Sequence, residues 1–325
     1  MCMKGKKILV TGGLGFIGRT LLETLITKNC GAKLFAIDIK DMPEDAELLR
    51  QNVEFQLLDI RDEIAVKNYI KNKNFDGIVH LAAVSRVVDA EKDKQNCIET
   101  NYKGTKYIAE AAAENPDCWM IFGSSREVYG EQNVLPVAEN AELLPMNIYG
   151  FYKLEGERII KSTVKRNCIL RFSNVYGNDY DIPTRVIPAF VRTAMSGGEI
   201  TLEGGSQVID FTHINDTVQA IIKCMQMLDS KRFESETIHV LPGVANKITD
   251  IIDILREMGL RFSVKVNPPR NYDVQRFVGD PSHLRETLGN VAVTDLRTGI
   301  KKLLEIYQPR PTIEALAGPS IWNRN

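Results

Sequence analysis

The chain has 325 residues, of which 44% are hydrophobic and 26% charged, and its formal net charge is -1. These values are typical of a globular domain, and a net charge so close to zero excludes a long-range field that would attract nucleic acid or an anionic membrane. A chain of this length can bury a substantial core unaided, so we expect a self-sufficient globular enzyme.

The six cysteines are scattered along the chain without the Cys-x-x-Cys or Cys/His spacing of a zinc site. The N-terminal stretch lacks the apolar core and cleavage site of a signal peptide, and no apolar run is long enough to span a bilayer. We therefore expect a cytoplasmic protein with reduced thiols, no disulfide framework and no bound metal.

The first half of the chain alternates short apolar runs with helix-like stretches. Strands are expected at residues 7–10, 34–37, 53–58, 77–81, 119–122 and 168–171, and helices at 17–27, 64–71, 105–113 and 149–163. This alternation predicts an α/β fold, a doubly wound parallel sheet of about seven strands with helices on both faces.

A glycine-rich loop follows the first expected strand directly. Gly12, Gly15 and Gly18 fit G-x-x-G-x-x-G, and Gly13, Gly15 and Gly18 fit G-x-G-x-x-G. Glycines here make a tight turn, let a pyrophosphate approach the backbone and place it at the N-terminus of the next helix. We therefore predict a Rossmann-type dinucleotide site formed by Gly12, Gly15, Phe16, Ile17 and Gly18.

The second expected strand ends in Asp38, about twenty residues after Gly18, as the dinucleotide fingerprint requires. A carboxylate at this position accepts hydrogen bonds from the adenosine ribose diol and repels the 2'-phosphate of NADP. The sequence therefore predicts NAD as the cofactor.

Tyr149 and Lys153 lie at i and i+4 of an expected helix, so they project from the same face. A tyrosine with a pKa of about 10 is a poor base near neutral pH, and a cation such as Lys153 stabilises its phenolate. Ser125 follows the strand at 119–122, and doubly wound sheets bind ligands at the carboxyl ends of their strands. We predict that Ser125, Tyr149 and Lys153 share one catalytic crevice, with Lys153 also holding the nicotinamide ribose.

The pattern becomes less regular after Asn174. Proline and glycine punctuate residues 181–188, 196–205 and 267–273, and a short helix is expected at 249–258. We predict an NAD-binding Rossmann domain at residues 1–173 and mainly a smaller, mixed α/β substrate-binding lobe at residues 174–325, with some segments returning to the first domain.

Together these motifs resemble the extended short-chain dehydrogenase/reductase family, and within it the NAD-dependent, UDP-glucose 4-epimerase-like enzymes that act on nucleotide sugars. The resemblance covers most of the chain, from Thr11 to about Gly289. Besides the motifs above, it rests on Asp59-Ile60, His80-Leu81-Ala82-Ala83, Asn101 in residues 101–105, Asn174 in residues 171–177, and Arg-Asn-Tyr-Asp-Val at residues 270–274.

The resemblance also implies individual roles. The cofactor site would be lined or supported by Asp59, Ile60, Leu81, Ala82, Ala83 and Asn101. A nucleotide-diphosphate sugar would be contacted by Ser85, Ser125, Arg126, Asn174 and Arg270. Asn101 and Asn174 have an alternative role as turn or helix-capping residues. Because family members commonly pair through helices, we expect a homodimer.

Two departures from the family pattern concern the substrate. Ile209 stands where relatives usually carry an arginine that pairs with the nucleotide diphosphate, and the stretch at residues 270–272 lacks the usual Pro-Gly. The resemblance therefore leaves the pose of the diphosphate open, and with it the nucleobase and the sugar.

The family chemistry removes a hydride from a sugar carbon while Tyr149 takes the hydroxyl proton and Ser125 hydrogen-bonds the same oxygen. Returning the hydride to the opposite face of the keto sugar gives an epimer. Losing water first gives a 4-keto-6-deoxy sugar, which requires a further acid or base such as Glu127. We favour the epimerase, in which Glu127 only shapes the pocket or pairs with Arg126; the alternatives are a 4,6-dehydratase and a non-catalytic protein that binds NAD and a sugar nucleotide.

Overall fold

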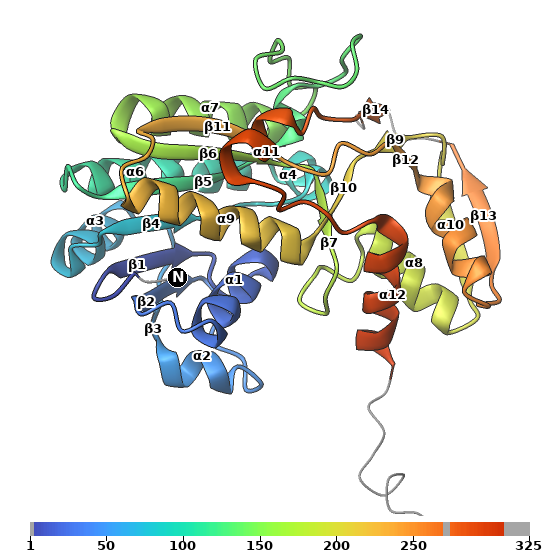
Figure 1. Ribbon diagram of the computed structural model, residues 1–325, viewed down its shortest axis with the longest axis horizontal. Helices are drawn as coiled ribbons and strands as arrows, with labels where there is room; N and C mark the ends of the chain where they lie inside the picture. The colour runs from blue at the N-terminus through green and yellow to red at the C-terminus, as the bar shows by residue number, and fades with distance from the viewer. Residues whose placement is uncertain (1–2, 269–273, 309–325) are drawn as a thin grey trace, which may run out of the picture.

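The computed structural model describes residues 3–268 and 274–308. Its central element is a sheet of seven parallel strands in the order β11-β6-β5-β4-β1-β2-β3 (Figure 1). The strands are β1 (Lys7–Thr11), β2 (Lys33–Asp38), β3 (Val53–Leu57), β4 (Gly77–His80), β5 (Trp119–Ser125), β6 (Arg166–Phe172) and β11 (Ser235–Val240). The strand order reverses between β1 and β4, and in such sheets the crevice at this switch point binds the ligand.

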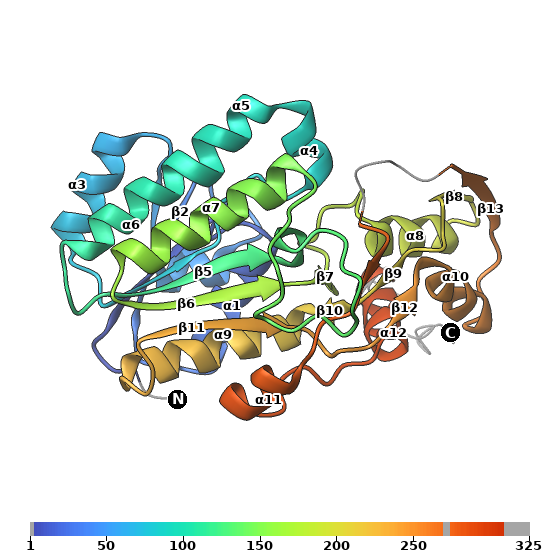
Figure 2. The ribbon, with the colours of Figure 1, turned by 90° about the horizontal axis from the view of Figure 1, so that it is seen from above.

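Helices cover both faces of the sheet (Figure 2). One face carries α1 (Phe16–Thr27), α2 (Glu47–Asn52), α9 (Ile214–Asp229) and α11 (Ser282–Leu288); the other carries α3 (Glu63–Lys73), α6 (Thr105–Ala113) and α7 (Ile148–Thr163). The short helices α4 (Val87–Lys92) and α5 (Lys94–Cys97) lead into a π-helix, η1 (Ile98–Gly104), and a 3-10 turn, η2 (Arg126–Val128), follows β5. Central strands such as β5 and β6 are buried along their whole length, as expected for a sheet covered on both sides.

The smaller lobe begins at β7 (Asn174–Tyr176) and has its own apolar core. Its helices are α8 (Val186–Met195), α10 (Ile248–Glu257) and α12 (Leu296–Tyr307). Its short strands are β8 (Glu199–Glu203), β9 (Val208–Ile209), β10 (Phe211–His213), β12 (Asn246–Lys247), β13 (Ser263–Asn267) and β14 (Arg276–Phe277). They pair in three small sheets, β10-β7, β12-β9-β14 and β13-β8, of which only the β12-β9 pair is antiparallel.

The predicted α/β class and doubly wound sheet are confirmed, but the seventh strand was not located from the sequence. The chain leaves the sheet after β6, builds part of the lobe, and returns with α9 and β11, which pairs with β6. β11 contains the fully buried His239, whose Nε2 lies 2.5 Å from the Tyr129 hydroxyl. Four of its six residues, Ser235, Glu236, Thr237 and His239, are polar, which hides the strand from an apolar-run criterion.

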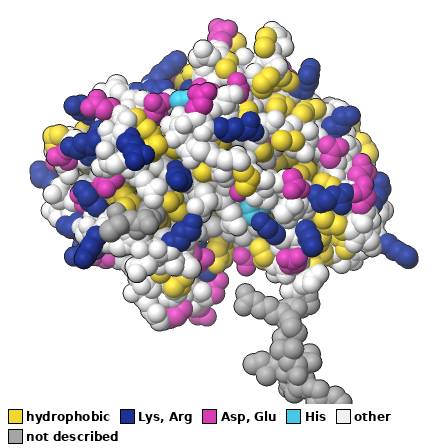
Figure 3. Space-filling model, in the orientation of Figure 1, with side chains coloured by type: hydrophobic (Ala, Val, Ile, Leu, Met, Phe, Trp, Pro, Cys, Tyr) yellow, Lys and Arg dark blue, Asp and Glu magenta, His cyan; other side chains and the backbone are white. Residues whose placement is uncertain are grey.

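Positive and negative side chains are interspersed on the face shown in Figure 3, in keeping with the net charge of -1. Among the described residues, no helix combines the length and the apolar character needed to cross a bilayer. Across the same residues, no group of three or more His, Cys, Asp or Glu side chains is placed to hold a metal ion.

Candidate active site

A cleft of about 1040 Å³ runs along the carboxyl ends of the sheet strands and continues under the smaller lobe. It brings together nearly all of the residues predicted from the sequence. Those that line it are Gly12, Gly15, Phe16, Ile17, Gly18, Asp38, Asp59, Ile60, Leu81, Ala82, Ala83, Ser85, Ser125, Arg126, Glu127, Tyr149, Lys153 and Asn174. Asn101 is not among the lining residues, and Arg270 lies outside the described residues.

The glycine loop leaves no room for side chains. Gly12 has a φ of 66°, and a Cβ there would lie 2.8 Å from the amide nitrogen of Ala82. A Cβ on Gly18 would overlap the carbonyl oxygen of Gly12. Gly15 is the N-cap of α1 and provides no side-chain cap, so the first amides of the helix remain available to an anion. This cradle fits the pyrophosphate of NAD.

Asp38 ends β2 on the wall of the cleft next to this loop. Its Oδ2 accepts a hydrogen bond from the backbone nitrogen of Leu14 at 3.0 Å, and its Oδ1 accepts one from that of Lys40 at 3.2 Å. Each carboxylate oxygen has a second acceptor site, so the carboxylate is fixed in place and still able to accept hydrogen bonds from a ribose diol.

We expect NAD to bind about tenfold or more tightly than NADP, because the extra phosphate would meet Asp38 as a like charge. Isothermal titration calorimetry with the two cofactors measures the difference. Asp38→Ser should reduce the difference in affinity between NAD and NADP. The matched variant Asp41→Ser, at a residue that does not line the cleft, should leave this difference unchanged. Equal affinities in the unmodified protein would show that Asp38 does not meet the ribose.

The segment after β4 is held by two buried polar side chains. Thr11 Oγ1 accepts hydrogen bonds from the amides of Leu81 and Ala82 at 3.2 and 3.1 Å and contacts His80 Nδ1 at 2.6 Å. Burial lowers the pKa of His80 to about 3, so this imidazole is neutral and structural. Asn101 also holds this segment through two hydrogen bonds to the backbone of Val84. Its Oδ1 accepts a hydrogen bond from the Val84 amide at 2.8 Å, and its Nδ2 donates one to the Val84 carbonyl oxygen at 3.0 Å. Asn101 therefore supports the cofactor wall from behind.

Asp59 and Ile60 lie after β3 and line the cleft. Arg61 holds the Asp59 carboxylate through Nη2 at 2.5 Å and lowers its pKa. Ile60 is buried against Gly104 of the π-helix, where a Cβ would come within 2.7 Å of the isoleucine side chain. The two residues thus form a fixed wall.

Ser125 and Tyr149 meet because α7 packs closely on the turn after β5. Asn147 caps α7 by accepting a hydrogen bond from the Gly150 amide at 2.8 Å, which places Tyr149 in the first turn of the helix. A Cβ on Gly150 would overlap the carbonyl oxygen of Glu127. The glycine therefore permits the approach that brings the Tyr149 phenol to the Ser125 hydroxyl.

Burial raises the pKa of Tyr149 to about 12, partly opposed by a hydrogen bond with Ser125 and by the charge of Arg185. Lys153 donates from Nζ to the carbonyl oxygen of Gly123 at 2.8 Å, and Nζ lies 5.9 Å from the centre of the Tyr149 ring. Burial also lowers the pKa of Lys153 to about 8. Desolvation thus outweighs the positive charge of Arg185 near the phenol, and the stabilisation of the Tyr149 phenolate by Lys153 stays a prediction.

Arg126 and Glu127 form a buried ion pair in the floor of the cleft, with Nη2 and Oε1 2.9 Å apart. The other carboxylate oxygen of Glu127 accepts a hydrogen bond from Asn147 Nδ2 at 2.8 Å. Arg126 Nε donates to Asn174 Oδ1 at 3.0 Å, which leaves the Asn174 amide group as a donor. The pairing of Glu127 with Arg126 anticipated from the sequence is confirmed.

Ile209, which stands where relatives usually carry an arginine, lines the part of the cleft that the lobe forms. Ile209 is 6% exposed and belongs to the same apolar cluster as Phe211 and Ile248. The following residue, Asp210, points away from this wall, because its Oδ2 accepts hydrogen bonds from the amides of Gly243 and Gly279. This wall can therefore pack against a ligand, but it cannot neutralise the negative charge of a diphosphate.

Sequence reasoning missed Asp181 and Arg185, which also line the cleft. Arg185 Nη1 pairs with Asp181 Oδ1 at 3.1 Å, and its Nη2 donates to the backbone oxygen and hydroxyl of Ser85 at 3.3 and 3.2 Å. Burial raises the pKa of Asp181 to about 6. The i, i+4 spacing of opposite charges was the available signal, but Ser85 is too distant in sequence for the pattern to reveal the contact.

The doubly wound sheet, the glycine loop and the Ser125, Tyr149 and Lys153 arrangement define an NAD-dependent enzyme of the short-chain dehydrogenase/reductase type. The chain belongs to the NAD dependent epimerase/dehydratase family, which matches residues 8–238. The predictions of family, fold class and cofactor are thus confirmed.

Three similar proteins illustrate the range of the family. A UDP-glucose 4-epimerase from Lactobacillus helveticus is 26% identical over 305 residues, 87% of this chain and 91% of the relative. The structure of a UDP-glucose 4-epimerase from Thermotoga maritima with UDP-glucose has a TM-score of 0.84 and 26% identity, covering 93% and 98% of the two chains. MoeE5 in complex with UDP-glucuronic acid and NAD has a TM-score of 0.83 and 26% identity, covering 92% and 98%. The protein is therefore similar to two UDP-glucose 4-epimerases and to a protein that binds UDP-glucuronic acid and NAD.

Proposed function

We propose that the protein is a nucleotide-sugar 4-epimerase that works through a transient keto sugar. The observation that carries this choice over a dehydratase is the state of Glu127. Both of its carboxylate oxygens are occupied, one by Arg126 and the other by Asn147, which caps the helix that bears Tyr149. Taking a proton from a sugar carbon would remove the charge that pairs with the buried Arg126 guanidinium, so this carboxylate serves the scaffold in our proposal.

In this proposal Tyr149 Oη removes the proton of the sugar hydroxyl, and Ser125 Oγ hydrogen-bonds the same oxygen. NAD, when bound, supplies the acceptor and later the donor of the hydride. Lys153 holds the nicotinamide ribose from the floor of the cleft, and Tyr149 returns its proton when the keto sugar is reduced on the opposite face. The intact Ser125, Tyr149 and Lys153 set gives no support to a role limited to binding.

The proposed substrate is a UDP-hexose. Two observations support it: the similar proteins named above act on or bind UDP-sugars, and the Asn174 side chain presents a donor to the cleft. We propose that residues 1–173 bind NAD and that the substrate is covered mainly by residues 174–325. We also propose that the protein is a homodimer and that it is located in the cytoplasm.

Incubation of the purified protein with UDP-glucose, UDP-galactose, UDP-N-acetylglucosamine and UDP-glucuronic acid, followed by NMR, tests the reaction. We expect at least one of these sugars to be converted to its 4-epimer, with the same equilibrium mixture reached from either epimer. A 4-keto-6-deoxy product would identify a dehydratase instead. Binding of NAD and UDP-sugar without any product or reduced cofactor would favour the non-catalytic alternative.

A further inference from the structure

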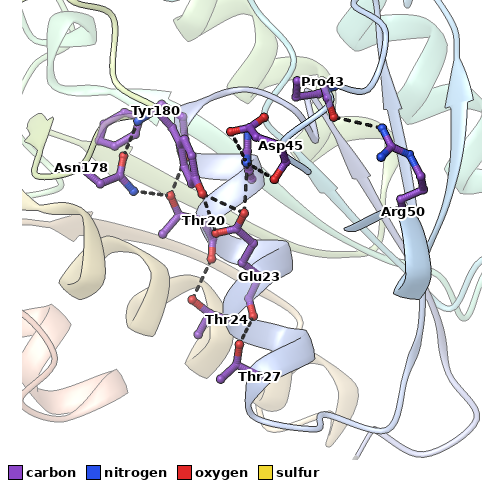
Figure 4. A network of polar contacts seen from close by, with 11 residues as sticks. Thr20, Glu23, Thr24, Thr27, Pro43, Asp45, Arg50, Asn178 and Tyr180 are labelled. Carbon is purple, nitrogen blue, oxygen red and sulfur yellow. Dashed lines mark hydrogen bonds and ion pairs between the residues drawn. The ribbon is translucent and has the colours of Figure 1, made fainter. Parts of the chain in front are cut away.

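Residues 178–185, here called the strap, are fastened to the helix that follows the glycine loop. Asn178 Nδ2 donates to the Thr20 hydroxyl at 2.8 Å, and the Tyr180 hydroxyl contacts the two carboxylate oxygens of Glu23 at 3.0 and 3.1 Å. Figure 4 shows Asn178 and Tyr180 lying against Thr20 and Glu23. Thr20 and Glu23 both belong to α1, so this end of the strap rests on the helix whose N-terminus forms the pyrophosphate cradle.

The other end of the strap is fastened to another segment that lines the cleft. Arg185 donates to the backbone oxygen and the hydroxyl of Ser85, in the segment after β4. Between the two ends, the side of the strap that faces inward lines the cleft through Tyr180, Asp181, Ile182, Thr184 and Arg185. The strap therefore connects α1 with the segment after β4 across the cofactor cleft.

Arg19 joins the strap to a third segment. Its guanidinium lies 4.0 Å from the centre of the Tyr180 ring, and its side chain is only 8% exposed. Nε pairs with Glu23 at 3.1 Å, while Nη1 and Nη2 donate to the two carboxylate oxygens of Asp45 at 3.2 and 3.0 Å. Asp45 belongs to the segment that follows β2, and the last residue of β2 is Asp38, which is predicted to bind the cofactor. In Figure 4, Asp45, Glu23 and Tyr180 converge on one point.

We propose that Arg19 and Tyr180 are positioning residues for bound NAD: they hold the strap on α1, so that the dinucleotide leaves only when the strap lifts. Arg19 does not line the cleft, and it acts through the Tyr180 ring and Asp45. A partly desolvated cation–π contact contributes about 1–2 kcal/mol, which corresponds to about a tenfold change in the rate of strap opening.

The test measures the release of NAD from the holoenzyme, with no sugar present, so that its outcome is independent of the reaction catalysed. Protein loaded with radiolabelled NAD is mixed with excess unlabelled NAD, and the label that remains bound is followed over time. We expect Arg19→Gln and Tyr180→Leu to release NAD about tenfold faster than the unmodified protein. Tyr180→Phe keeps the ring over which Arg19 lies and should show a smaller increase.

Two further variants separate positioning from general destabilisation. Asp45→Asn alters a carboxylate that is 68% exposed, so it leaves the core intact and should accelerate release about twofold. Arg192→Gln is the matched control, because the Arg192 guanidinium also lies over a tyrosine ring, that of Tyr307 at 3.8 Å, and neither of these residues lines the cleft. It should leave the release rate unchanged.

A second readout distinguishes cofactor retention from a role in chemistry. Arg19→Gln should raise the KM for NAD and leave kcat at saturating NAD within about twofold of the unmodified protein. Unchanged release of NAD in the folded Arg19→Gln and Tyr180→Leu variants would overturn the proposal. An equal acceleration in Arg192→Gln would overturn it as well, since the effect would then be one of overall stability.

Discussion

Replacing Tyr149 by phenylalanine is expected to leave NAD bound but to lower turnover about a thousandfold. The phenol is the proton acceptor in the proposed mechanism, and phenylalanine preserves the ring that packs in the cleft while removing the hydroxyl. Turnover is measured with the sugar nucleotide converted in the substrate panel, and bound NAD is quantified after the protein is denatured. The expected loss is in kcat, because the ring contacts that bind the ligands remain.

Tyr152→Phe is the matched control for this experiment. Tyr152 lies on the same helix, and its ring packs against Tyr102 and Phe151 without lining the cleft. We expect near-normal turnover in this variant. Near-normal turnover in Tyr149→Phe would remove Tyr149 from the mechanism.

The raised pKa of Tyr149 adds a pH dependence to the expected result. In the chain alone the phenol has a pKa of about 12, so it is protonated near neutral pH and the active phenolate is a minor form. A base that must lose its proton is more active at higher pH, so kcat/KM of the unmodified protein should rise with pH across the neutral range. The residual activity of Tyr149→Phe should lack this rise.

Local sequence patterns were sufficient to predict which residues lie together in the cofactor half of the site. The glycine loop, Asp38 and the i, i+4 pair of Tyr149 and Lys153 are each defined by short spacings, and each spacing requires one backbone geometry. The close approaches of Gly12 to Ala82 and of Gly150 to Glu127 explain why glycine stands at these positions. The structure places these residues along one cleft, as predicted.

Contacts between distant parts of the chain could not be predicted in the same way. The strap depends on Tyr180 meeting Glu23 and on Arg185 meeting Ser85, and neither pair forms a local pattern. β11 was missed because most of its residues are polar, and the burial of His239 beside Tyr129 depends on a contact between distant parts of the chain. Desolvation, which raises the pKa of Tyr149, likewise depends on the packing of the whole site and has no local sequence signal.

Removing the Glu127 carboxylate is expected to destabilise the fold and to leave the type of reaction unchanged. Glu127 and Arg126 are each 7% exposed, so Glu127→Ala leaves a buried guanidinium without its counter-charge, at a cost of about 3 kcal/mol in the free energy of unfolding. Glu127→Gln retains a hydrogen-bond acceptor for Asn147, so it should lower the free energy of unfolding by less than Glu127→Ala does. Urea unfolding of the two variants measures these losses.

A double variant tests whether the loss comes from the unpaired charge. Combining Glu127→Gln with Arg126→Met removes both members of the ion pair, so part of the stability lost in Glu127→Gln should return. If the losses of the two single changes simply add in the double variant, the guanidinium has a partner other than Glu127 that compensates its charge.

The chemical part of the same prediction uses deuterium from the solvent. A dehydratase takes a proton from the carbon next to the oxidised one, and the product formed in heavy water carries deuterium there. An epimerase returns the original hydride to the oxidised carbon and leaves its neighbour untouched. Because proton uptake by Glu127 would leave the buried Arg126 guanidinium without its counter-charge, we expect no deuterium in the product and appreciable epimerisation by Glu127→Gln. Deuterium at the neighbouring carbon that disappears in Glu127→Gln would identify Glu127 as the base and the protein as a dehydratase.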